Sequence, residues 1–325
     1  MEQRCLPATT TELAEPNTAH IPAWVAVAGG AARFAFEEFL YGQIRNPYTR
    51  KAYLHAVRVF SRWCEQRGLE LTRVTPADVG RHLDSLAVAP PTRKLHLAAL
   101  RRLFDQLVLR HVLVLNPALS VRGERYQVLE GKTQEISIEH ARRLLRSIDT
   151  SHVVGLRDRA VIAILIYTVA RVGAVARLRR ADFYESGEQY CLRFNEKGGK
   201  SREIPVRHDL RAFLLDYIAG AGFTEHEPLM PLFRTTIRRT KRLTARPLTA
   251  DDMACMVKRR LRDAGLSLRL SPHSFRVMAI TDLLSQGVSL EEVQFLAGHA
   301  DPRTTRLYDR RQRRVTRNIV ERISV

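Results

Sequence analysis

Cysteine is scarce in this sequence, and its four copies form no pairs. Cys5, Cys64, Cys191 and Cys255 lie far apart and include no Cys-x-x-Cys spacing. Zinc sites and the disulfide frameworks of small domains use closely spaced cysteines, so we expect neither here. The pattern is typical of a reducing compartment, and we expect a cytoplasmic protein.

Long apolar runs are also lacking. A membrane-spanning helix needs about 18 or more consecutive apolar residues, and no such stretch is present. The apolar run at residues 21–32 follows Glu2, Glu12 and Glu15 rather than a basic cluster, so it does not resemble a secretory signal. No basic helix flanked by tryptophan is present either, and we expect no membrane partner.

Acidic residues are few relative to basic ones. The 325 residues include 53 Lys and Arg against 34 Asp and Glu, which gives a formal net charge of +19. This excess predicts a polyanionic partner, and nucleic acid is the better candidate because the membrane signals are missing. The basic residues are spread along amphipathic segments, which indicates a folded binding surface rather than a basic tail.

The remaining composition is that of a globular protein, and its length favours two domains. Residues 1–34 carry no sustained period, so we treat them as an N-terminal extension. Residues 35–120 show only helical signals, including helix starts at Asn46-Pro47, Thr75-Pro76 and Pro90-Pro91. They predict a small domain of four or five helices with one basic side.

The basic side of this helical domain supplies candidate contacts to nucleic acid. The candidates from its helices are Arg50, Lys51, Arg58, Lys94 and Arg101. A solvated helix face explains any single one of them equally well.

Residues 121–135 contain glycines and charges but little apolar content, and they predict an interdomain linker. A second domain, residues 136–325, is expected to follow. Its one clear sheet signal is a β-hairpin, in which Tyr190, Leu192 and Phe194 alternate toward the turn and Ile204 and Val206 alternate away from it. We expect the rest of this domain to be helical, so the fold class is mainly α with a small β-sheet or hairpin.

Two segments of the second domain carry residues suited to an anion. Residues 160–170 form an apolar stretch that predicts a buried helix, and Arg171 closes it at the edge of a core. Taken alone, Arg171 is better explained as a snorkelling or salt-bridged arginine. Ser271-Pro272 predicts a helix start that places His273 and Arg276 in the first turn, three residues apart, where free amides and the helix dipole also favour phosphate.

Further along, Ser289 to Glu292 predicts a capping box, and Gly298 predicts the end of that short helix. His299 follows at once and should sit on a fixed turn. Asp301-Pro302 then predicts another helix that leads through Thr304 and Thr305 to Tyr308. A tyrosine at such spacing is often a core residue, but its charged neighbours also suit a phenol that faces phosphate.

Together these motifs resemble the tyrosine recombinase (phage integrase) family, over roughly residues 38–325, and the chain is similar in size to simple Xer- and Cre-like members. Thr168 to Arg171 resembles the family's first-arginine motif, and residues 273–276 resemble its HxxR. Lys197 is similar to the hairpin lysine, and Leu296 to His299 resembles the LGH motif that precedes the nucleophile, Tyr308. Ala174 departs from the pattern, because many relatives carry an acidic residue there.

The resemblance implies a covalent 3′-phosphotyrosine intermediate in DNA cleavage and rejoining. A phenol with a pKa near 10 is a weak nucleophile at neutral pH, so it needs a base or cationic surroundings. Arg171 and Arg276 would stabilise the phosphoryl transition state, and His299 would donate a hydrogen bond to it. His273 would move the proton of Tyr308 or bridge to phosphate. The resemblance assigns protonation of the departing 5′ oxygen to Lys197, with Lys200 on the same turn as the competing candidate.

No cofactor and no metal are implied, because side chains supply the cations. Lys200 and Arg202 join the helical domain's basic residues as candidate DNA contacts. The family further implies that a SAM-like helical domain and a catalytic domain form a C-shaped clamp on double-stranded DNA. The apolar stripe Val315, Ile319 and Ile323 suggests a C-terminal helix that docks on a neighbouring protomer to form a homotetramer, although docking on its own chain is an alternative.

We therefore predict a bacterial, nucleoid-associated recombinase that integrates, excises or resolves DNA, of mobile-element or Xer-like type. A type IB topoisomerase and a DNA-binding protein that has lost cleavage are the alternatives. The short N-terminal extension favours a simple recombinase over lambda-type integrases, which carry a separate arm-binding domain.

Overall fold

The computed structural model describes residues 21–124, 133–195, 201–224, 227–237 and 240–308. Its internal contacts divide the chain into two units, Met1–Gln127 and Val128–Val325, so the division falls within the predicted linker. Each unit is described by itself below. No helix in the described ranges is both long enough and apolar enough to cross a membrane.

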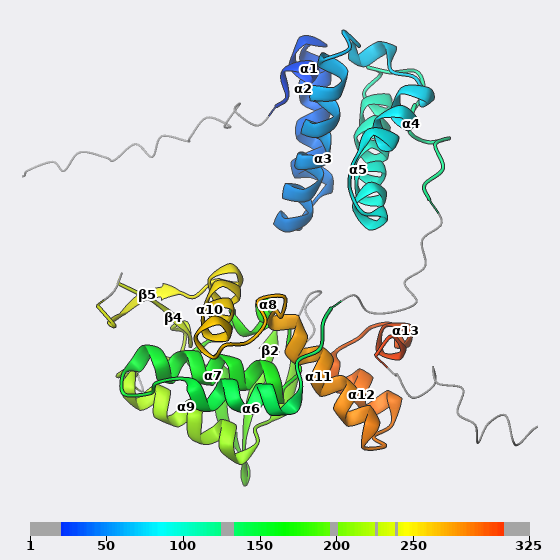
Figure 1. Cartoon of the computed structure of the whole chain (residues 1–325). Coiled ribbons are helices and arrows are strands. Elements are labelled where there is room, and N and C mark those ends of the chain that lie inside the picture. Colours follow the sequence, from blue (N-terminus) through cyan, green and yellow to red (C-terminus); the bar gives the residue numbers. More distant parts are fainter. Residues whose placement is uncertain (1–20, 125–132, 196–200, 225–226, 238–239, 309–325) are drawn as a thin grey trace, which may run out of the picture. The chain divides into compact units, whose positions relative to one another are not determined.

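The described part of the first unit consists of helices and the loops between them. Its elements are α1 (Ala23–Val27), α2 (Gly30–Glu37), the π-helix η2 (Glu38–Gln43), α3 (Pro47–Glu65), the 3-10 turn η3 (Leu71–Arg73), α4 (Pro76–Ser85) and α5 (Pro90–Leu109) (Figure 1). The predicted helix starts are confirmed. The Asn46 side chain accepts a hydrogen bond from the Tyr48 amide at 2.9 Å, and Thr75 and Asp78 form a capping box.

Aromatic rings fill the centre of this unit. The ring of Phe60 lies 5.5 Å from that of Trp24, 4.9 Å from that of His82 and 6.0 Å from that of Phe104. His82 is fully buried, and neither of its ring nitrogens has a hydrogen-bond partner among the described residues. Burial, and then the charges of His96 and Arg67, lower the pKa of His82 to about 4.

Part of the predicted N-terminal extension is helical. Residues 23–37 form α1 and α2, and the boundary expected at residue 35 falls inside α2. Trp24 is buried, and its indole N–H donates to the Leu69 carbonyl at 2.7 Å. No helical period is visible in this part of the sequence because α1 is only five residues long.

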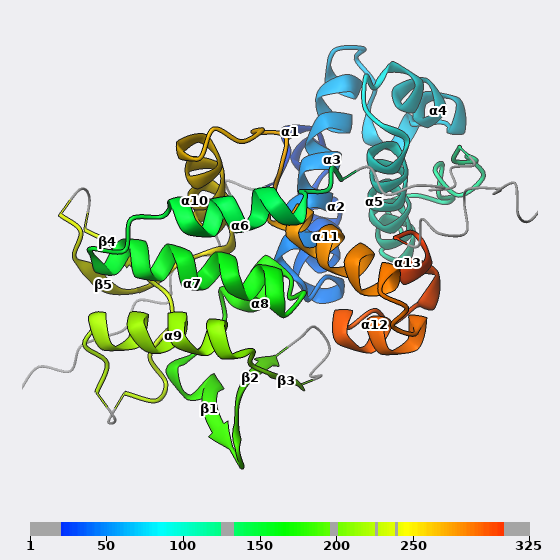
Figure 2. The ribbon, with the colours of Figure 1, turned by 60° about the horizontal axis from the view of Figure 1, so that its bottom comes forward.

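The second unit combines helices with two small sheets. Its helical elements are α6 (Ile138–Ser147), α7 (Val153–Tyr167), α8 (Val172–Val175), the 3-10 turn η4 (Arg180–Asp182), α9 (His208–Gly220), α10 (Ala250–Asp263), α11 (Pro272–Ser285), α12 (Leu290–Ala297) and α13 (Pro302–Arg306). The second half of α7, residues 160–167, is apolar on all sides, as the run at 160–170 predicts. The helix lies between α6 and α9 (Figure 2). Helices α12 and α13 lie beyond the end of α11.

The sheets correct one prediction. Strands β1 (Phe183–Ser186), β2 (Gln189–Asn195) and β3 (Ser201–Pro205) form one antiparallel sheet, in which Leu192 pairs with Ile204 as the hairpin pattern predicts. The expectation that the rest of the domain is helical was wrong, since β1 and a second sheet, β4 (Arg234–Thr236) with β5 (Leu243–Pro247), are also present. These strands have three to five residues and no clear alternation, so only pairing across the sheet defines them.

One buried carboxylate fastens α7 to α10. The Asp158 side chain is fully buried and accepts hydrogen bonds from Arg157 at 2.7 Å, Arg259 at 3.0 Å and Arg260 at 2.8 Å. Arg157 also donates to the Arg234 carbonyl on β4 at 2.8 Å. A buried charge is tolerated when paired in this way, so this cluster joins two helices and a strand.

Candidate active site

Helix α11 carries the HxxR residues at its first turn. Pro272 is the first residue of the helix, and the Ser274 hydroxyl accepts a hydrogen bond from the Ser271 amide at 3.0 Å. The predicted helix start is therefore confirmed. It places His273 and Arg276 three residues apart, on one face of the helix.

Arg276 ties together two other segments of the site. Its side chain is 1% exposed, and its guanidinium donates to the Val169 carbonyl and, at 2.6 Å, to the Ala297 carbonyl. Val169 lies two residues before Arg171, and Ala297 lies two residues before His299. One buried arginine thus fixes the backbone that leads to each of these two side chains.

The segment before Arg171 has an unusual backbone. The Thr168 hydroxyl donates to the Ile164 carbonyl at 2.7 Å and accepts from the Ala170 amide at 3.3 Å. Val169 has φ 56°, a left-handed conformation that β-branched residues rarely adopt, and its side chain is buried. This geometry turns the chain at the end of α7 and brings the Val169 carbonyl to Arg276.

Arg171 itself is exposed and is the N-cap residue of α8. Its guanidinium makes no hydrogen bond or ion pair with the residues that the structure describes. Ala174 is a buried core residue on α8, so this position supplies no carboxylate to Arg171.

The turn that carries His299 is built as the sequence predicts. Ser289 and Glu292 form the capping box at the start of α12, and Gly298 ends the helix with φ 61° in the left-handed conformation. The His299 amide donates to the Gln294 carbonyl at 3.1 Å. The His299 side chain is 7% exposed, and its Nδ1 lies 2.9 Å from the Thr305 hydroxyl.

Tyr308 lies two residues after the end of α13 and contacts both histidines. The Asp301 carboxylate accepts a hydrogen bond from the Arg303 amide at 2.9 Å, which caps the helix. The Tyr308 hydroxyl lies 3.1 Å from His273 Nε2, within hydrogen-bond distance. The Tyr308 ring also stacks on the His299 ring, with centroids 5.9 Å apart and planes 10° apart.

Positive charge surrounds both histidines. Desolvation, and then the charges of Arg276 and Arg171, lower the pKa of His273. The same causes in the same order, with smaller contributions from His273 and Arg202, lower the pKa of His299 to about 3. Both rings are therefore neutral at pH 7, and the positive charge near them comes from the arginines.

Of the three candidate residues on the hairpin, the structure describes only Arg202. Lys197 and Lys200 lie outside the described residues, so their predicted roles stay predictions. Arg202 lies on β3, is 8% exposed and packs its guanidinium over the Phe194 ring at 5.8 Å. Arg202 alternates with the exposed Glu203 and shares its face of β3 with the buried Ile204, a pattern that indicates an inward position. Its predicted contact with DNA stays a prediction.

The basic residues of the helical unit fall into two groups. The Arg50 guanidinium donates to the carbonyls of Leu40 and Ile44 at 2.9 and 2.8 Å. Arg101 donates to two carbonyls in the segment after α5. Both arginines thus stabilise their own unit. Lys51, Arg58 and Lys94 lie along α3 and α5 with exposed or partly exposed side chains. The DNA contacts of all five stay predictions.

Metal ligands are not gathered in the described part of the chain: no group of three or more His, Cys, Asp or Glu side chains could hold an ion there.

Two family descriptions match most of the chain. Residues 135–314 match the description "Phage integrase family". Residues 35–111 match "Phage integrase, N-terminal SAM-like domain". The first match spans Arg171, His273, Arg276, His299 and Tyr308.

Individual proteins agree with these matches. The chain is 28% identical to the tyrosine recombinase XerC of Myxococcus xanthus over 269 residues, which cover 81% of this chain and 87% of XerC. It is 27% identical to the tyrosine recombinase XerD of Ralstonia nicotianae over 279 residues, which cover 82% and 84% of the two chains.

Two solved structures are similar in fold. The XerH site-specific recombinase bound to its difH substrate in a post-cleavage complex has a TM-score of 0.64 and 20% identity, with 81% of this chain and 77% of that chain covered. A lambda integrase dimer bound to a COC′ core site has a TM-score of 0.65 and 17% identity, with 94% and 99% covered.

A helical unit, a mainly helical catalytic unit and these sequence matches define a tyrosine-type site-specific DNA recombinase. The chain belongs to the phage integrase family.

Proposed function

We propose that this recombinase cleaves DNA by attack of the Tyr308 hydroxyl oxygen on a backbone phosphorus atom. The phosphorus–O5′ bond breaks, a 3′-phosphotyrosine ester forms, and the departing 5′ oxygen takes up a proton. Attack of a 5′ hydroxyl on the ester then reverses these steps and rejoins the strands. One ester is exchanged for another, so resealing needs no nucleotide hydrolysis.

The observation that carries this proposal is the 3.1 Å contact between the Tyr308 hydroxyl and His273 Nε2. A general base must be within hydrogen-bond distance of the proton that it removes, and it must be unprotonated. His273 meets the first condition by this distance. It meets the second because burial, and then the charges of Arg276 and Arg171, lower its pKa. Of the two roles considered for His273, this geometry favours proton transfer from Tyr308.

The remaining roles follow from charge and position. The exposed guanidinium of Arg171 binds the non-bridging phosphate oxygens. The buried Arg276 adds positive charge to the site and, through the carbonyls of Val169 and Ala297, holds the segments that carry Arg171 and His299. His299 donates a hydrogen bond to a phosphate oxygen, and Lys197 protonates the 5′ oxygen. Loss of one such donor typically lowers the rate by about 10²–10³.

Duplex DNA is the proposed partner. XerH and lambda integrase are similar in fold and were solved on DNA, and the net charge of +19 suits a polyanion. If roughly ten phosphates are neutralised, affinity should fall as about the ninth power of the salt concentration. The C-shaped clamp belongs to the same proposal, as does action in the bacterial cytoplasm at the nucleoid.

The test is trapping of the covalent adduct. Genomic fragments captured covalently by the purified protein are sequenced to find the site, and a site duplex nicked near the cleavage position is then used as a suicide substrate. We expect a protein–DNA adduct with the wild type and none with Tyr308→Phe. An adduct that persists in Tyr308→Phe would refute the assignment. The sequenced sites would also distinguish integration or excision of a mobile element from Xer-like resolution.

Neither alternative is favoured. The similar proteins are named as recombinases rather than topoisomerases. A protein that only binds DNA does not need a phenol within hydrogen-bond distance of a neutral histidine, as Tyr308 is of His273.

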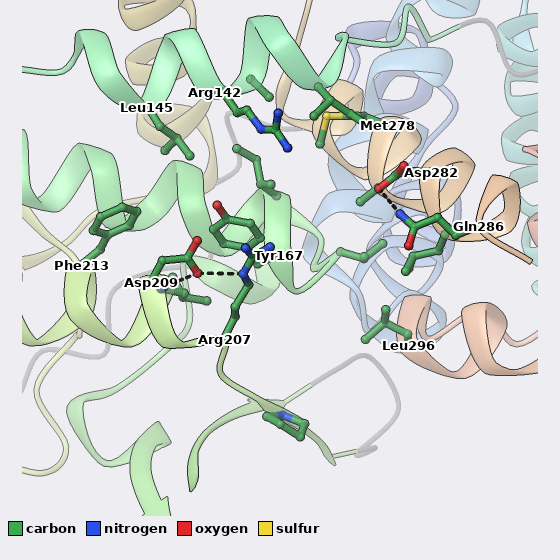
Figure 3. Close-up of a pocket in the computed structure, with 18 of the residues that line it drawn as sticks. Arg142, Leu145, Tyr167, Arg207, Asp209, Phe213, Met278, Asp282, Gln286 and Leu296 are labelled. Carbon is green, nitrogen blue, oxygen red and sulfur yellow. Dashed lines mark hydrogen bonds and ion pairs between the residues drawn. The ribbon is translucent and has the colours of Figure 1, made fainter. Parts of the chain in front are cut away.

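We further propose assembly of four protomers through the C-terminal segment, which lies outside the described residues. A pocket of about 730 Å³ on the catalytic unit supports this idea. Leu145, Phe213, Met278 and Leu296 give it apolar walls from α6, α9, α11 and α12 (Figure 3). Charged and polar groups are also drawn around it, including the ion pair of Arg207 with Asp209. The stripe Val315, Ile319 and Ile323 would fit such walls.

Deletion of residues 313–325 should abolish synapsis of two sites and cooperative DNA binding. Leu283→Arg, which places a charge in the pocket wall, should do the same. Leu268→Arg is the matched control, because Leu268 is 47% exposed and does not line the pocket. Intact synapsis after the deletion would exclude this mode of assembly.

A further inference from the structure

Thr305 makes a contact that none of the roles above uses. Its side chain is fully buried, and its hydroxyl lies 2.9 Å from Nδ1 of His299. Thr305 lies on α13, three residues before Tyr308, and the Tyr308 amide donates to its carbonyl at 3.0 Å. Thr305 is therefore bonded to one functional side chain and lies on the helix that leads to another.

The direction of the His299 hydrogen bond decides what that ring can do. A neutral imidazole carries one proton, so one nitrogen donates and the other accepts. His299 is neutral at pH 7, because its pKa is lowered to about 3. If Nε2 is to donate to a phosphate oxygen, Nδ1 must accept, and its partner must be a donor. A threonine hydroxyl can rotate to supply that proton, whereas a carbonyl or carboxylate cannot.

We propose that Thr305 is a positioning residue for strand cleavage: its hydroxyl donates to Nδ1 of His299 and thereby directs an Nε2–H toward the scissile phosphate. The proposal rests on the role of His299 given above. The buried hydroxyl fixes the tautomer of the ring, and the stack of the His299 ring on Tyr308 fixes its plane. Docking of α13 thus delivers the nucleophile and orients the phosphate donor in one step.

A merely structural role for Thr305 makes a different prediction. If Thr305 only fills space under α13, valine should replace it well, because valine has nearly the same shape. If the hydroxyl is needed, serine should replace it better than valine. The adjacent Thr304 is the matched control, since it lies on the same helix and its side chain is only partly buried.

The experiment measures the single-turnover rate of adduct formation on the nicked site duplex, with DNA affinity and thermal unfolding measured in parallel. Thr305→Val should lower the cleavage rate by about 10- to 100-fold, as loss of a partner that orients a functional histidine typically does. DNA affinity should not change. Thr305→Ser should keep the rate within about threefold of wild type, as retention of the hydrogen bond requires, and Thr304→Val should match wild type. A Thr305→Val enzyme as fast as wild type, or one faster than Thr305→Ser, overturns the proposal.

A double-mutant cycle tests whether Thr305 acts through His299. His299→Ala sets the largest loss that Thr305 can cause, and Thr305→Val should have no further effect in that background. The same fold-loss with and without His299 would show that Thr305 acts elsewhere. Nitrogen-15 spectra of labelled histidine, assigned with His299→Ala, should show the Nε2–H tautomer in the wild type, and the Nδ1–H tautomer would refute the proposal.

These outcomes separate the two proposals. Absence of any wild-type adduct would remove the proposed function itself. A Tyr308-dependent adduct that does not respond to Thr305→Val would leave the function intact and remove only the role of Thr305.

Discussion

Val169 holds a backbone conformation that glycine would adopt more easily, and this can be measured. Val169 has φ 56° and lies in a small core with Ile280, Leu284 and Val293. An L-residue in the left-handed region costs about 1–2 kcal/mol relative to glycine. Removal of the buried valine methyl groups costs about 2 kcal/mol. Val169→Gly alone therefore mixes two opposing effects.

Comparison of Val169→Gly with Val169→Ala removes the burial effect, because both variants lose the methyl groups. In helices and strands, glycine is less stable than alanine by about 0.5–1 kcal/mol. At position 169 we expect the opposite order, with glycine more stable by about 1 kcal/mol, because only alanine keeps the left-handed strain. For a unit of this size, that corresponds to roughly 2–4 °C in Tm.

The assay is urea unfolding of the full chain, followed by far-ultraviolet circular dichroism. Trp24 and Trp63 are the chain's two tryptophans, and both lie in the first unit. Their fluorescence identifies that unit's transition, and the remaining dichroism change reports on the catalytic unit. Ala212→Gly, at an exposed position within α9, is the control and should destabilise by about 0.5–1 kcal/mol. If alanine at 169 is more stable than glycine by the control's margin, the strain argument is wrong.

Three further predictions concern charge. Asp158→Asn should destabilise the catalytic unit by about 3–5 kcal/mol, because three arginines lose their buried anion, and an unchanged urea midpoint would contradict this. The folded-state pKa of His82 is about 4 against an ordinary value of 6.5, so the first unit should keep its full stability above pH 6.5. His82 should contribute a loss of about 3 kcal/mol between pH 6.5 and 4; tryptophan fluorescence in urea measures the loss, and the His82→Leu variant should lack this contribution. Since the pKa of His273 is lowered and its neutral form accepts the proton of Tyr308, the cleavage rate at subsaturating DNA should fall only below pH 6.5; an acid limb centred above pH 6.5 would exclude this role.

Much of the secondary structure could be predicted because helix ends are encoded locally. Asn46, Thr75, Ser289 and Asp301 each cap a helix through atoms two or three residues away. Such signals need no tertiary context. Strands β1, β4 and β5 could not be predicted, because strands of three to five residues are defined by pairing across a sheet.

The helices within residues 21–34 could not be predicted for a related reason. Trp24 is part of a core only because α3 and the segment after it supply Phe60 and the Leu69 carbonyl. The sequence near Trp24 contains neither of these partners.

The sequence by itself determined the chemical types of the site residues and their order along the chain, since local motifs and caps carry both. Only the tertiary structure decided which groups meet: Arg276 with the carbonyls of Val169 and Ala297, His273 with Tyr308, and Thr305 with His299. The physical reason is the separation along the chain between the groups that interact. A cap joins atoms a few residues apart, whereas Arg276 and Val169 are 107 residues apart and meet only because α7 and α11 pack together.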